Sequence, residues 1–222
     1  MKVLAVAVHP DDETLGCGGT ILKHIENGDD VAWLIITNVK EEYGFSKDRV
    51  DVRNGEIDSV AKEYGFSKVY NLEFQPAGLT SETQKDLIDG VSAVVNDFQP
   101  ETIYMINRSD AHSDHRYSFQ ACFACTKPFR YPFVKKVLMY ECISETEFSP
   151  ALPENMFQPN YYVDVTKHLD KKLEIMKIFD SEVSPHPFPR SIENIKSLAM
   201  FRGASVGVYY AEAFVLLRNI DK

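Results

Sequence analysis

Two short segments of the chain, HPDDE beginning at His9 and HSDH beginning at His112, place histidines next to carboxylates. His9 and Asp12 are three residues apart, and so are His112 and His115, so that each pair can face one direction. Histidine nitrogens and carboxylate oxygens suit Zn²⁺ or a similar divalent cation. A bound cation would also neutralise acids that are costly to bury together. These four residues are therefore candidate metal ligands.

The number of ligands decides the chemistry of such a site. Four protein ligands would close it into a structural zinc site, whereas three would leave a position for water. Zinc lowers the pKa of that water to about 7, which makes a hydroxide nucleophile near neutral pH. Asp11 and the histidine left over would then serve proton transfer and charge stabilisation, with Asp114 orienting that histidine. The spacing alone leaves both alternatives open.

Strand-like and helix-like segments alternate along the chain, which is typical of an α/β fold with a mostly parallel sheet. We expect strands at Lys2–Val8, Val31–Thr37, Lys68–Leu72, Thr102–Ile106, Lys136–Tyr140 and Tyr161–Val165, and a last apolar segment at Ala211–Leu217. We expect helices at about Leu15–Asn27, Val50–Tyr64, Glu82–Phe98, His115–Thr126, Lys167–Phe179 and Ile192–Arg202. No linker divides the chain, so residues 1–222 are predicted to form a single domain. Because both polar clusters follow a strand, they should meet at the carboxyl edge of the sheet.

The composition excludes several classes of protein. The chain has 33 acidic against 24 basic residues, a formal charge of −9, which argues against nucleic acid as a partner. No apolar run approaches the roughly 18 residues that a membrane span needs. Met1 and Lys2 lead straight into a strand-like segment without a secretory leader. We therefore expect a cytoplasmic protein without a membrane span.

Two further motifs have both a functional and a structural interpretation. The glycine-rich GCGG at Gly16–Gly19 could be a phosphate loop, but it matches neither the dinucleotide fingerprint nor the P-loop. We favour close packing of the first helix on the sheet. Cys122 and Cys125 form a lone CxxC without the second pair that a zinc site needs. We expect them to be buried, unpaired residues on one face of a helix.

HPDDETLGCGG together with HSDH resembles the PIG-L/LmbE-like family of zinc-dependent N-acetylglucosaminyl deacetylases. RNGEIDSVAKEYGF (Arg53–Phe66), DKKLEIMKIFDSEV and RGASVGVYYAEAF (Arg202–Phe214) extend the resemblance over most of the chain. Many relatives have Thr-x-Gly after the second strand, where this chain has Thr37, Asn38 and Val39. The resemblance implies a Rossmann-like α/β fold and a hydrolase that removes an N-acetyl group from an amino sugar or its conjugate.

The resemblance also implies a role for each residue of the two main motifs. His9, Asp12 and His115 would bind zinc, with Fe²⁺ or Co²⁺ as alternatives, because two histidines and a carboxylate are a permissive set. Asp11 would be the general base that activates the zinc-bound water.

The remaining implied roles concern His112, Asp114 and Arg53. His112 would support the oxyanion of the tetrahedral intermediate and protonate the leaving amine, with Asp114 holding its orientation. Arg53 would contact the substrate, through sugar hydroxyls or an attached anionic group. Thus only the resemblance singles out His112 as the histidine that does not bind the metal.

Two other functions remain as alternatives. A nucleotide-binding module would use GCGG as its phosphate loop and would have no use for HSDH. A non-catalytic metal-binding domain would have a closed four-ligand site and would lose its metal in His112→Ala. Arg190 and Arg202 are further candidates for contact with an anionic substrate, and His186 for the substrate entrance. The aromatic segment FRYPF belongs either to the core or to a contact within a homo-oligomer.

Overall fold

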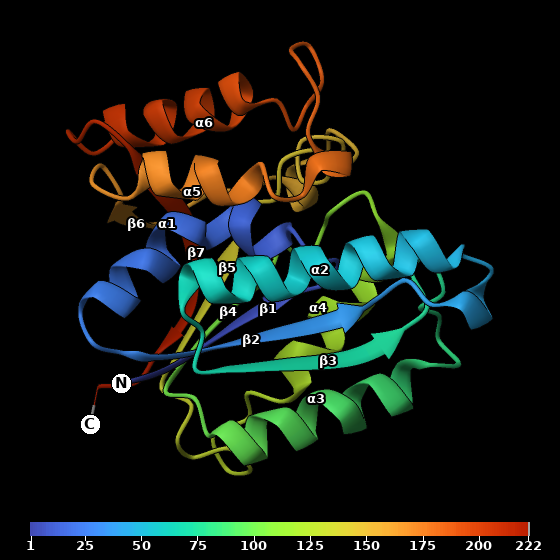
Figure 1. Cartoon of the computed structure of the whole chain (residues 1–222). Helices are drawn as coiled ribbons and strands as arrows, with labels where there is room; N and C mark the ends of the chain where they lie inside the picture. Colours follow the sequence, from blue (N-terminus) through green and yellow to red (C-terminus); the bar gives the residue numbers. More distant parts are fainter. Residues whose placement is uncertain (222) are drawn as a thin grey trace.

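The computed structural model describes residues 1–221, and the strands within this range form one seven-stranded sheet in the order β3-β2-β1-β4-β5-β7-β6 (Figure 1). The first five strands are parallel, and β7 runs antiparallel to β5 and β6. The predicted mostly parallel α/β sheet is therefore confirmed. The strands are β1 (Lys2–Ala7), β2 (Asp30–Thr37), β3 (Lys68–Phe74), β4 (Thr102–Ile106), β5 (Lys136–Tyr140), β6 (Tyr161–Asp164) and β7 (Ala211–Asn219).

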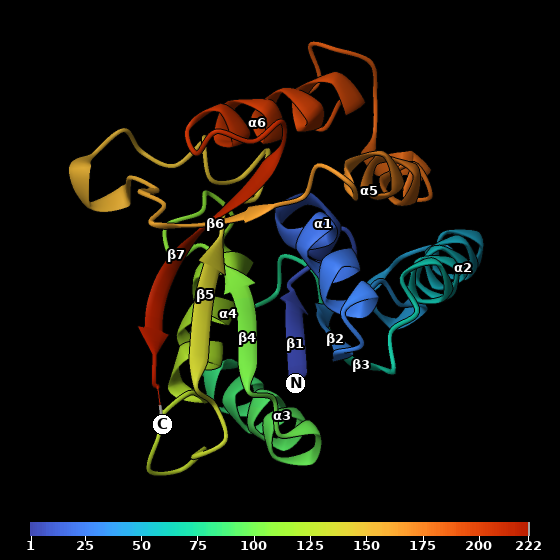
Figure 2. The same ribbon diagram turned by 90° about the vertical axis from the view of Figure 1, so that its left-hand side faces the viewer.

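Helices cover both faces of the sheet. On one face α1, α2 and α5 contact one another, and α6 packs on α5 and β7; on the other face α3 packs on α4 (Figures 1 and 2). The α-helices are α1 (Asp12–Glu26), α2 (Lys47–Tyr64), α3 (Gln84–Phe98), α4 (Ser113–Ala124), α5 (Leu169–Met176) and α6 (Ile192–Ala204). Three short 3₁₀ helices are η1 (Glu41–Tyr43), η2 (Pro153–Asn155) and η3 (Asp180–Glu182).

Several helix boundaries differ from those predicted. Helix α1 begins at Asp12 rather than at Leu15, because acidic side chains in a first turn complement the helix dipole. Helix α4 begins at Ser113, because the side chain of His112 acts as the N-cap and accepts the backbone N–H of Asp114. Both boundaries matter, because they place each polar motif directly at a helix N-terminus at the carboxyl edge of the sheet.

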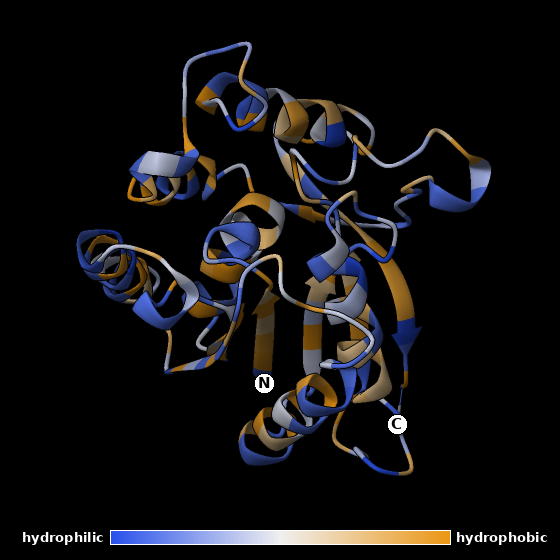
Figure 3. Ribbon diagram, turned by 90° about the vertical axis from the view of Figure 1, so that its right-hand side faces the viewer, coloured by the Kyte–Doolittle hydropathy of each residue, from blue (hydrophilic) through white to orange (hydrophobic). Residues whose placement is uncertain are grey.

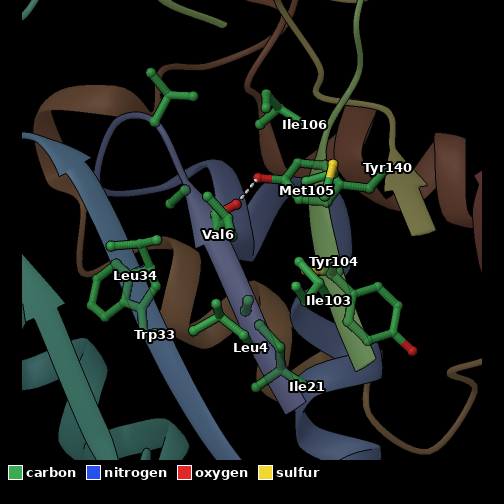
Figure 4. Packing of buried hydrophobic residues seen from close by; sticks show 14 of the residues in the cluster. Leu4, Val6, Ile21, Trp33, Leu34, Ile103, Tyr104, Met105, Ile106 and Tyr140 are labelled. Carbon is green, nitrogen blue, oxygen red and sulfur yellow. Dashed lines mark hydrogen bonds between the residues drawn. The ribbon is translucent and has the colours of Figure 1, made fainter. Parts of the chain in front are cut away.

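The core lies around the central strands. β1 is apolar and buried beyond its first residue, as expected for a parallel strand with helices on both faces, and Figure 3 shows it in the hydrophobic colour beside the N-terminus. Figure 4 shows Trp33 of β2 and Tyr104 of β4 on either side of β1. The hydroxyl of Tyr140 donates a hydrogen bond to the carbonyl of Val6, 2.6 Å away. This contact ties the end of β1 to β5, just before the first polar motif.

The glycine-rich segment of α1 is explained by close packing. A Cβ atom at Gly16 would lie 2.1 Å from the ring of Tyr140, and one at Gly19 would lie 2.8 Å from Val165. These contacts confirm the packing interpretation of GCGG and remove its support as a phosphate loop. Cys122 in α4 and Cys125 just after it are free and buried, which confirms the structural interpretation of CxxC.

Helix α1 is interrupted at Cys17, whose dihedral angles (φ −142°, ψ 20°) are not helical. The carboxylate of Glu212 in β7 accepts the N–H groups of Gly19 and Thr20 at 2.9 and 2.7 Å, and so caps the second half of the helix. The ammonium of Lys172 in α5 donates to Glu212 at 2.7 Å and to a carbonyl of the first half at 2.9 Å. This buried ion pair, the α1 clamp, fixes the helix that carries Asp12.

No helix within residues 1–221 combines the length and the apolar character needed to cross a membrane.

Candidate metal centre

Three of the predicted ligands meet at the carboxyl ends of β1 and β4. His115 Nε2 lies 3.4 Å from His9 Nδ1 and 3.4 Å from Asp12 Oδ2, and His9 Nδ1 lies 3.9 Å from the same carboxylate oxygen. Asp12 and His115 are buried, and His9 is partly exposed. The backbone N–H groups of Val8 and His9 donate to Asp12 Oδ2 at 3.0 and 2.8 Å and hold the carboxylate in place. The three ligand atoms thus form a compact triangle.

The triangle fits a tetrahedral zinc ion. Zinc bonds of 2.0–2.1 Å place tetrahedral ligands about 3.3–3.4 Å apart, and two of the three separations are 3.4 Å. Metal-binding histidines usually donate their other ring N–H to a carboxylate. Here Asp110 Oδ2 lies 2.9 Å from His115 Nδ1, and Asp114 Oδ2 lies 3.4 Å from His9 Nε2. The donor set and its supporting carboxylates therefore suit Zn²⁺.

Sequence reasoning missed Asp110. Its carboxylate is buried and also accepts hydrogen bonds from the Asn107 amide at 2.8 Å and the Thr146 hydroxyl at 2.7 Å. These contacts fix the carboxylate that orients His115. The sequence did offer a signal: Asp110 is an acid in NRSDAHSDH, only five residues before the candidate ligand His115. An acid so close to a candidate histidine ligand is a candidate hydrogen-bond partner for it.

The charges around His115 favour a cation. Burial lowers the pKa of its imidazole, but the carboxylates of Asp12 and Asp110 outweigh burial and raise the pKa to about 9. The raised pKa shows that the surrounding carboxylates favour a positive charge at the position of His115. A divalent cation can replace the proton of that imidazole and interact with the same carboxylates.

Asp11 lies between β1 and α1 in an unusual backbone conformation. Its φ of 143° lies where residues other than glycine are rarely found, and such strain often occurs at functional sites. The backbone N–H of Asp11 donates to Glu13 Oε2 at 3.3 Å, which helps to hold this conformation. Burial, and then the neighbouring charge of Asp12, raise the pKa of the Asp11 carboxyl well above its usual value. A carboxylate with a raised pKa is suited to accept a proton near neutral pH.

His112 lies beside the triangle, with its ring 4.7 Å from that of His9 between centroids. It does not belong to the group formed by His9, Asp12 and His115, but it forms a second such group with His9 and Asp114; in each group the ligand atoms lie within 4.8 Å of one another. Burial, and then the charge of His9, lower the pKa of His112. Its Nδ1 accepts the backbone N–H of Asp114 at 3.1 Å, so the proton of the neutral ring lies on Nε2. His112 is thus prepared to donate a hydrogen bond through Nε2.

The resemblance implies that Asp114 orients His112, and the structure shows that the backbone of Asp114, rather than its side chain, makes this contact. The backbone N–H of Asp114 orients His112, whereas its carboxylate lies 3.9 Å from His112 Nδ1. That carboxylate accepts the backbone N–H groups of Ala77 and Leu79 at 2.6 and 3.1 Å and approaches His9. It is therefore better placed to orient the ligand His9 than to orient His112 by a side-chain hydrogen bond.

A cavity of about 280 Å³ opens over these groups. His9, Asp11, Asp12 and His112 line it. Its other lining residues are Pro10, Leu15, Thr37, Asn38, Val39, Phe45, Arg49, Arg53, Pro76, Ser144, Glu145, Glu182 and Arg190. Residues 37–39, which are Thr-Asn-Val here instead of the Thr-x-Gly of many relatives, are therefore part of the cavity wall.

Arg53 lines the cavity, but its strongest contacts are with the protein. Its Nη1 donates to the carbonyl of Pro10 at 2.8 Å, its Nη2 pairs with Glu182, and its side chain is only 5% exposed. Arg53 therefore supports the turn that carries Asp11. Sequence reasoning also missed Glu182 and Glu145. Glu182 lies in DKKLEIMKIFDSEV, where the resemblance assigns it no role, and Glu145 lies in a segment without a recognisable motif. The backbone N–H of His112 donates to Glu145 Oε2 at 2.9 Å.

Arg190 and Arg202, both considered for contact with an anionic substrate, lie in different places. Arg190 lines the cavity of the metal centre. Arg202 forms two hydrogen bonds with Glu141, at 2.7 and 2.6 Å, and lines a separate cavity. His186 is exposed in the loop before Arg190 and is not among the lining residues of the metal-site cavity.

The chain belongs to the PIG-L family. The sequence profile of that family, described as GlcNAc-PI de-N-acetylase, matches residues 4–126, which include every residue of the triangle as well as Asp11 and His112. The match confirms the family resemblance drawn from HPDDE and HSDH.

Individual relatives extend the similarity to the whole chain. A diacetylchitobiose deacetylase from Thermococcus kodakarensis is 24% identical over 228 residues, which cover 99% of this chain and 84% of the relative. The structure of the conserved protein TT1542 from Thermus thermophilus superposes with a TM-score of 0.75 at 24% identity, over 99% of this chain and 96% of the other. GalB from Pseudomonas putida, a 4-carboxy-2-hydroxymuconate hydratase, shares the fold with a TM-score of 0.73 at 18% identity, over 100% and 98% of the two chains. Because a hydratase shares this fold, the reaction has to be argued from the site.

Proposed function

We propose that this protein is a Zn²⁺-dependent deacetylase that hydrolyses the N-acetyl group of an amino sugar of the N-acetylglucosamine type or of its conjugate. The observation that carries the proposal is the compact triangle of His9, Asp12 and His115, next to a strained carboxylate with a raised pKa in an open cavity. The diacetylchitobiose deacetylase among its relatives supports the class of substrate.

The triangle would hold the metal, with Asp110 and Asp114 fixing its two histidines. Bound there, Zn²⁺ supplies a Lewis acid that polarises a carbonyl and lowers the pKa of a water. Fe²⁺ or Co²⁺ could supply the same chemistry with this donor set.

Asp11 acts as the general base in this proposal. Its carboxylate accepts the proton of the water that attacks the amide carbonyl, and the raised pKa makes the carboxylate a competent acceptor. The same carboxyl group then returns the proton to the leaving amine nitrogen. The hydrogen bond from the backbone N–H of Asp11 to Glu13 holds the turn from which the carboxylate projects, and so limits the reorganisation that the reaction needs.

His112 stabilises the oxyanion of the tetrahedral intermediate through its Nε2–H. Because its Nδ1 is occupied by the N–H of Asp114, a second proton on the ring would face a donor and is disfavoured. This favours a neutral hydrogen-bond donor over a proton donor, and therefore assigns the protonation of the amine to Asp11. Oxyanion donors of this kind typically contribute about 10²–10³ to turnover.

The test couples metal content to acetate release. The purified protein is analysed for metal per chain, and acetate is then measured with N-acetylglucosamine, diacetylchitobiose and simple N-acetylglucosaminides, before and after chelation. We expect one metal per chain and acetate release that a chelator abolishes and Zn²⁺ restores. A metal-loaded protein without acetate release from any of these amides would contradict the proposed reaction. Failure to take up a divalent metal would contradict the proposed centre.

A further inference from the structure

The carboxylate of Asp12 uses its two oxygens in different ways. Oδ2 accepts the backbone N–H groups of Val8 and His9 and is the oxygen of the triangle of candidate ligands. Oδ1 lies 3.2 Å from the sulfur of Cys142, which donates its thiol hydrogen. Within residues 1–221 no other hydrogen bond reaches Oδ1, so the thiol alone decides whether this oxygen is occupied.

The thiol of Cys142 has one hydrogen and two acceptors within reach. The carbonyl oxygen of Ile143 lies 3.7 Å from the sulfur, farther than the 3.2 Å to the carboxylate of Asp12. A thiol is a weak donor, but a charged acceptor strengthens the hydrogen bond, and so does burial. Asp12 and Cys142 are only 3% and 1% exposed. The nearer, charged and buried acceptor therefore takes the hydrogen.

The turn that begins with Cys142 contacts both buried ligands of the triangle. The backbone N–H of Cys142 donates to the Thr146 hydroxyl at 2.8 Å, and the N–H of Thr146 donates to the carbonyl of Cys142 at 2.9 Å. The Thr146 hydroxyl in turn donates to Asp110, the carboxylate beside His115. One turn after β5 thus holds Asp12 through the thiol and His115 through Asp110.

Cys142 lies beside the triangle and is not one of its members. Within residues 1–221, two groups bring at least three possible ligand atoms within 4.8 Å of one another, and Cys142 belongs to neither. Cysteine sulfur is a good ligand for zinc, so its place outside both groups distinguishes a neighbour of a ligand from a ligand.

Occupation of Oδ1 bears on how Asp12 can bind a metal ion. A carboxylate can coordinate through one oxygen or through both. Coordination through Oδ1 would compete with the hydrogen bond from Cys142, whereas coordination through Oδ2 leaves that bond intact. Binding through Oδ2 alone keeps the coordination number at three protein atoms and leaves the fourth tetrahedral position open.

We propose that Cys142 is a positioning residue of the metal centre, whose thiol occupies Asp12 Oδ1 and restricts the carboxylate to one metal-binding oxygen. The inference rests on the metal centre of the proposed function, but not on its reaction. Cys142 thereby helps to set both the affinity for the metal and the number of atoms that coordinate it.

Three variants separate this role from simple packing. Cys142→Ala removes the donor, and Cys142→Ser keeps a donor at the same position. Cys122→Ala is the matched control, because it removes a buried thiol of the same size from α4, the helix that carries His115. The sulfur of Cys122 forms no hydrogen bond in the part of the chain that the structure describes. A loss of packing should therefore appear in this control, whereas a loss of positioning should not.

The first measurement is the affinity for Zn²⁺, by competition with a chelator of known affinity. Hydrogen-bond partners of metal ligands typically contribute 10–100-fold to metal affinity. We expect Cys142→Ala to bind Zn²⁺ about tenfold more weakly or worse, and Cys142→Ser to recover most of the loss. Cys122→Ala should bind Zn²⁺ like the unmodified protein.

The second measurement is the visible spectrum after loading with Co²⁺, which reports coordination directly. The visible absorption of Co²⁺ is strongest in four-coordinate sites and weakens when a further ligand atom joins. We expect weaker absorption in Cys142→Ala, because Oδ1 is then free to coordinate. The unmodified protein, Cys142→Ser and Cys122→Ala should share the stronger spectrum.

Several results would overturn the role of Cys142. Equal Zn²⁺ affinity and equal Co²⁺ spectra in Cys142→Ala and the unmodified protein would remove it and leave the metal centre standing. An equal loss in Cys122→Ala would assign the effect to packing. A sulfur-to-cobalt charge-transfer band that disappears in Cys142→Ala would make the thiol a ligand instead.

The two measurements also separate this inference from the proposed reaction, because neither needs turnover. A protein that binds metal with the expected differences but releases no acetate contradicts the reaction and supports the role of Cys142. A protein that takes up neither Zn²⁺ nor Co²⁺ contradicts the metal centre and the role of Cys142 with it.

Discussion

Residues of the segment 141–147 line two cavities that differ in size and in chemistry. The larger, about 550 Å³, is lined by Leu152, Met156, Leu198 and Phe201 along with a balanced Arg202–Glu141 pair. The smaller, about 280 Å³, has two of the candidate ligands, His9 and Asp12, in its wall together with Asp11. The largest apolar cavity is the usual first guess for an active site. Here the group formed by His9, Asp12 and His115, together with the neighbouring Asp11 carboxyl, indicates where the chemistry lies better than cavity volume does.

The largest difference in activity between the two cavities is expected from a substitution of Asp11 in the smaller one. We predict that Asp11→Asn lowers kcat by about 10²–10⁴-fold, because it removes the proton acceptor. Metal content should stay at one per chain, since Asp11 is not part of the triangle of ligands. Asparagine has nearly the same shape and tolerates positive φ better than most residues, so that the fold should be kept. Unchanged turnover in this variant would remove Asp11 as the base.

His112 tests whether the smaller cavity holds an open or a closed site. We predict that His112→Ala lowers kcat by about 10²–10³-fold through the loss of an oxyanion donor, while the metal stays bound. Metal content and kcat should be measured on the same preparation. If the metal is lost with the histidine, the site has four ligands and the non-catalytic alternative is the better one.

A substitution of Asp110 tests whether the carboxylates that contact the ligand histidines contribute to metal affinity. We predict that Asp110→Asn weakens metal binding about 10–100-fold, because the carboxylate orients His115 and increases its basicity. Competition with a chelator of known affinity measures the change. Asp170→Asn, at an exposed position of α5, is the matched control and should bind metal like the unmodified protein. Equal affinities of the two variants would contradict the role given to Asp110.

The larger cavity should give the smallest effect on activity. We predict that Arg202→Gln leaves kcat/KM for a neutral substrate unchanged, because the residue does not line the metal-site cavity. The free energy of unfolding should fall by about 1–3 kcal/mol, because the largely buried Glu141 loses its partner. Chemical denaturation and steady-state kinetics measure the two quantities. A large loss of activity at full stability would show that the larger cavity takes part in the reaction.

The sequence predicted those parts of the site that depend on local spacing. His9, Asp12 and His115 lie in short motifs directly after strands, and the alternation of elements placed both motifs at one edge of the sheet. The start of α1 at Asp12 could also have been derived, because acids favour a helix N-terminus. The family, the parallel sheet and the packing role of Gly16 followed from the same kind of local pattern.

The parts that could not be predicted depend on contacts between distant segments. Glu182 meets Arg53 across 129 residues, and no periodicity or motif indicates such a pair. The carboxylate of Asp114 accepts hydrogen bonds from backbone N–H groups in the loop before α3. No local sequence pattern predicts the path of that loop. Arg190 and Arg202 look alike in sequence, and only the fold separates the one in the metal-site cavity from the one outside it.

The α1 clamp has a consequence for the order in which the protein assembles during synthesis. The N–H groups of Gly19 and Thr20 are made more than 190 residues before Glu212, the carboxylate that caps them. While the ribosome still holds β7, the second half of α1 lacks its cap and Lys172 lacks its partner. The α1 clamp can therefore form only after β7 has left the exit tunnel, and we expect zinc uptake to follow that step. Metal binding by stalled nascent chains, compared before and after β7 leaves the exit tunnel, would show that order directly.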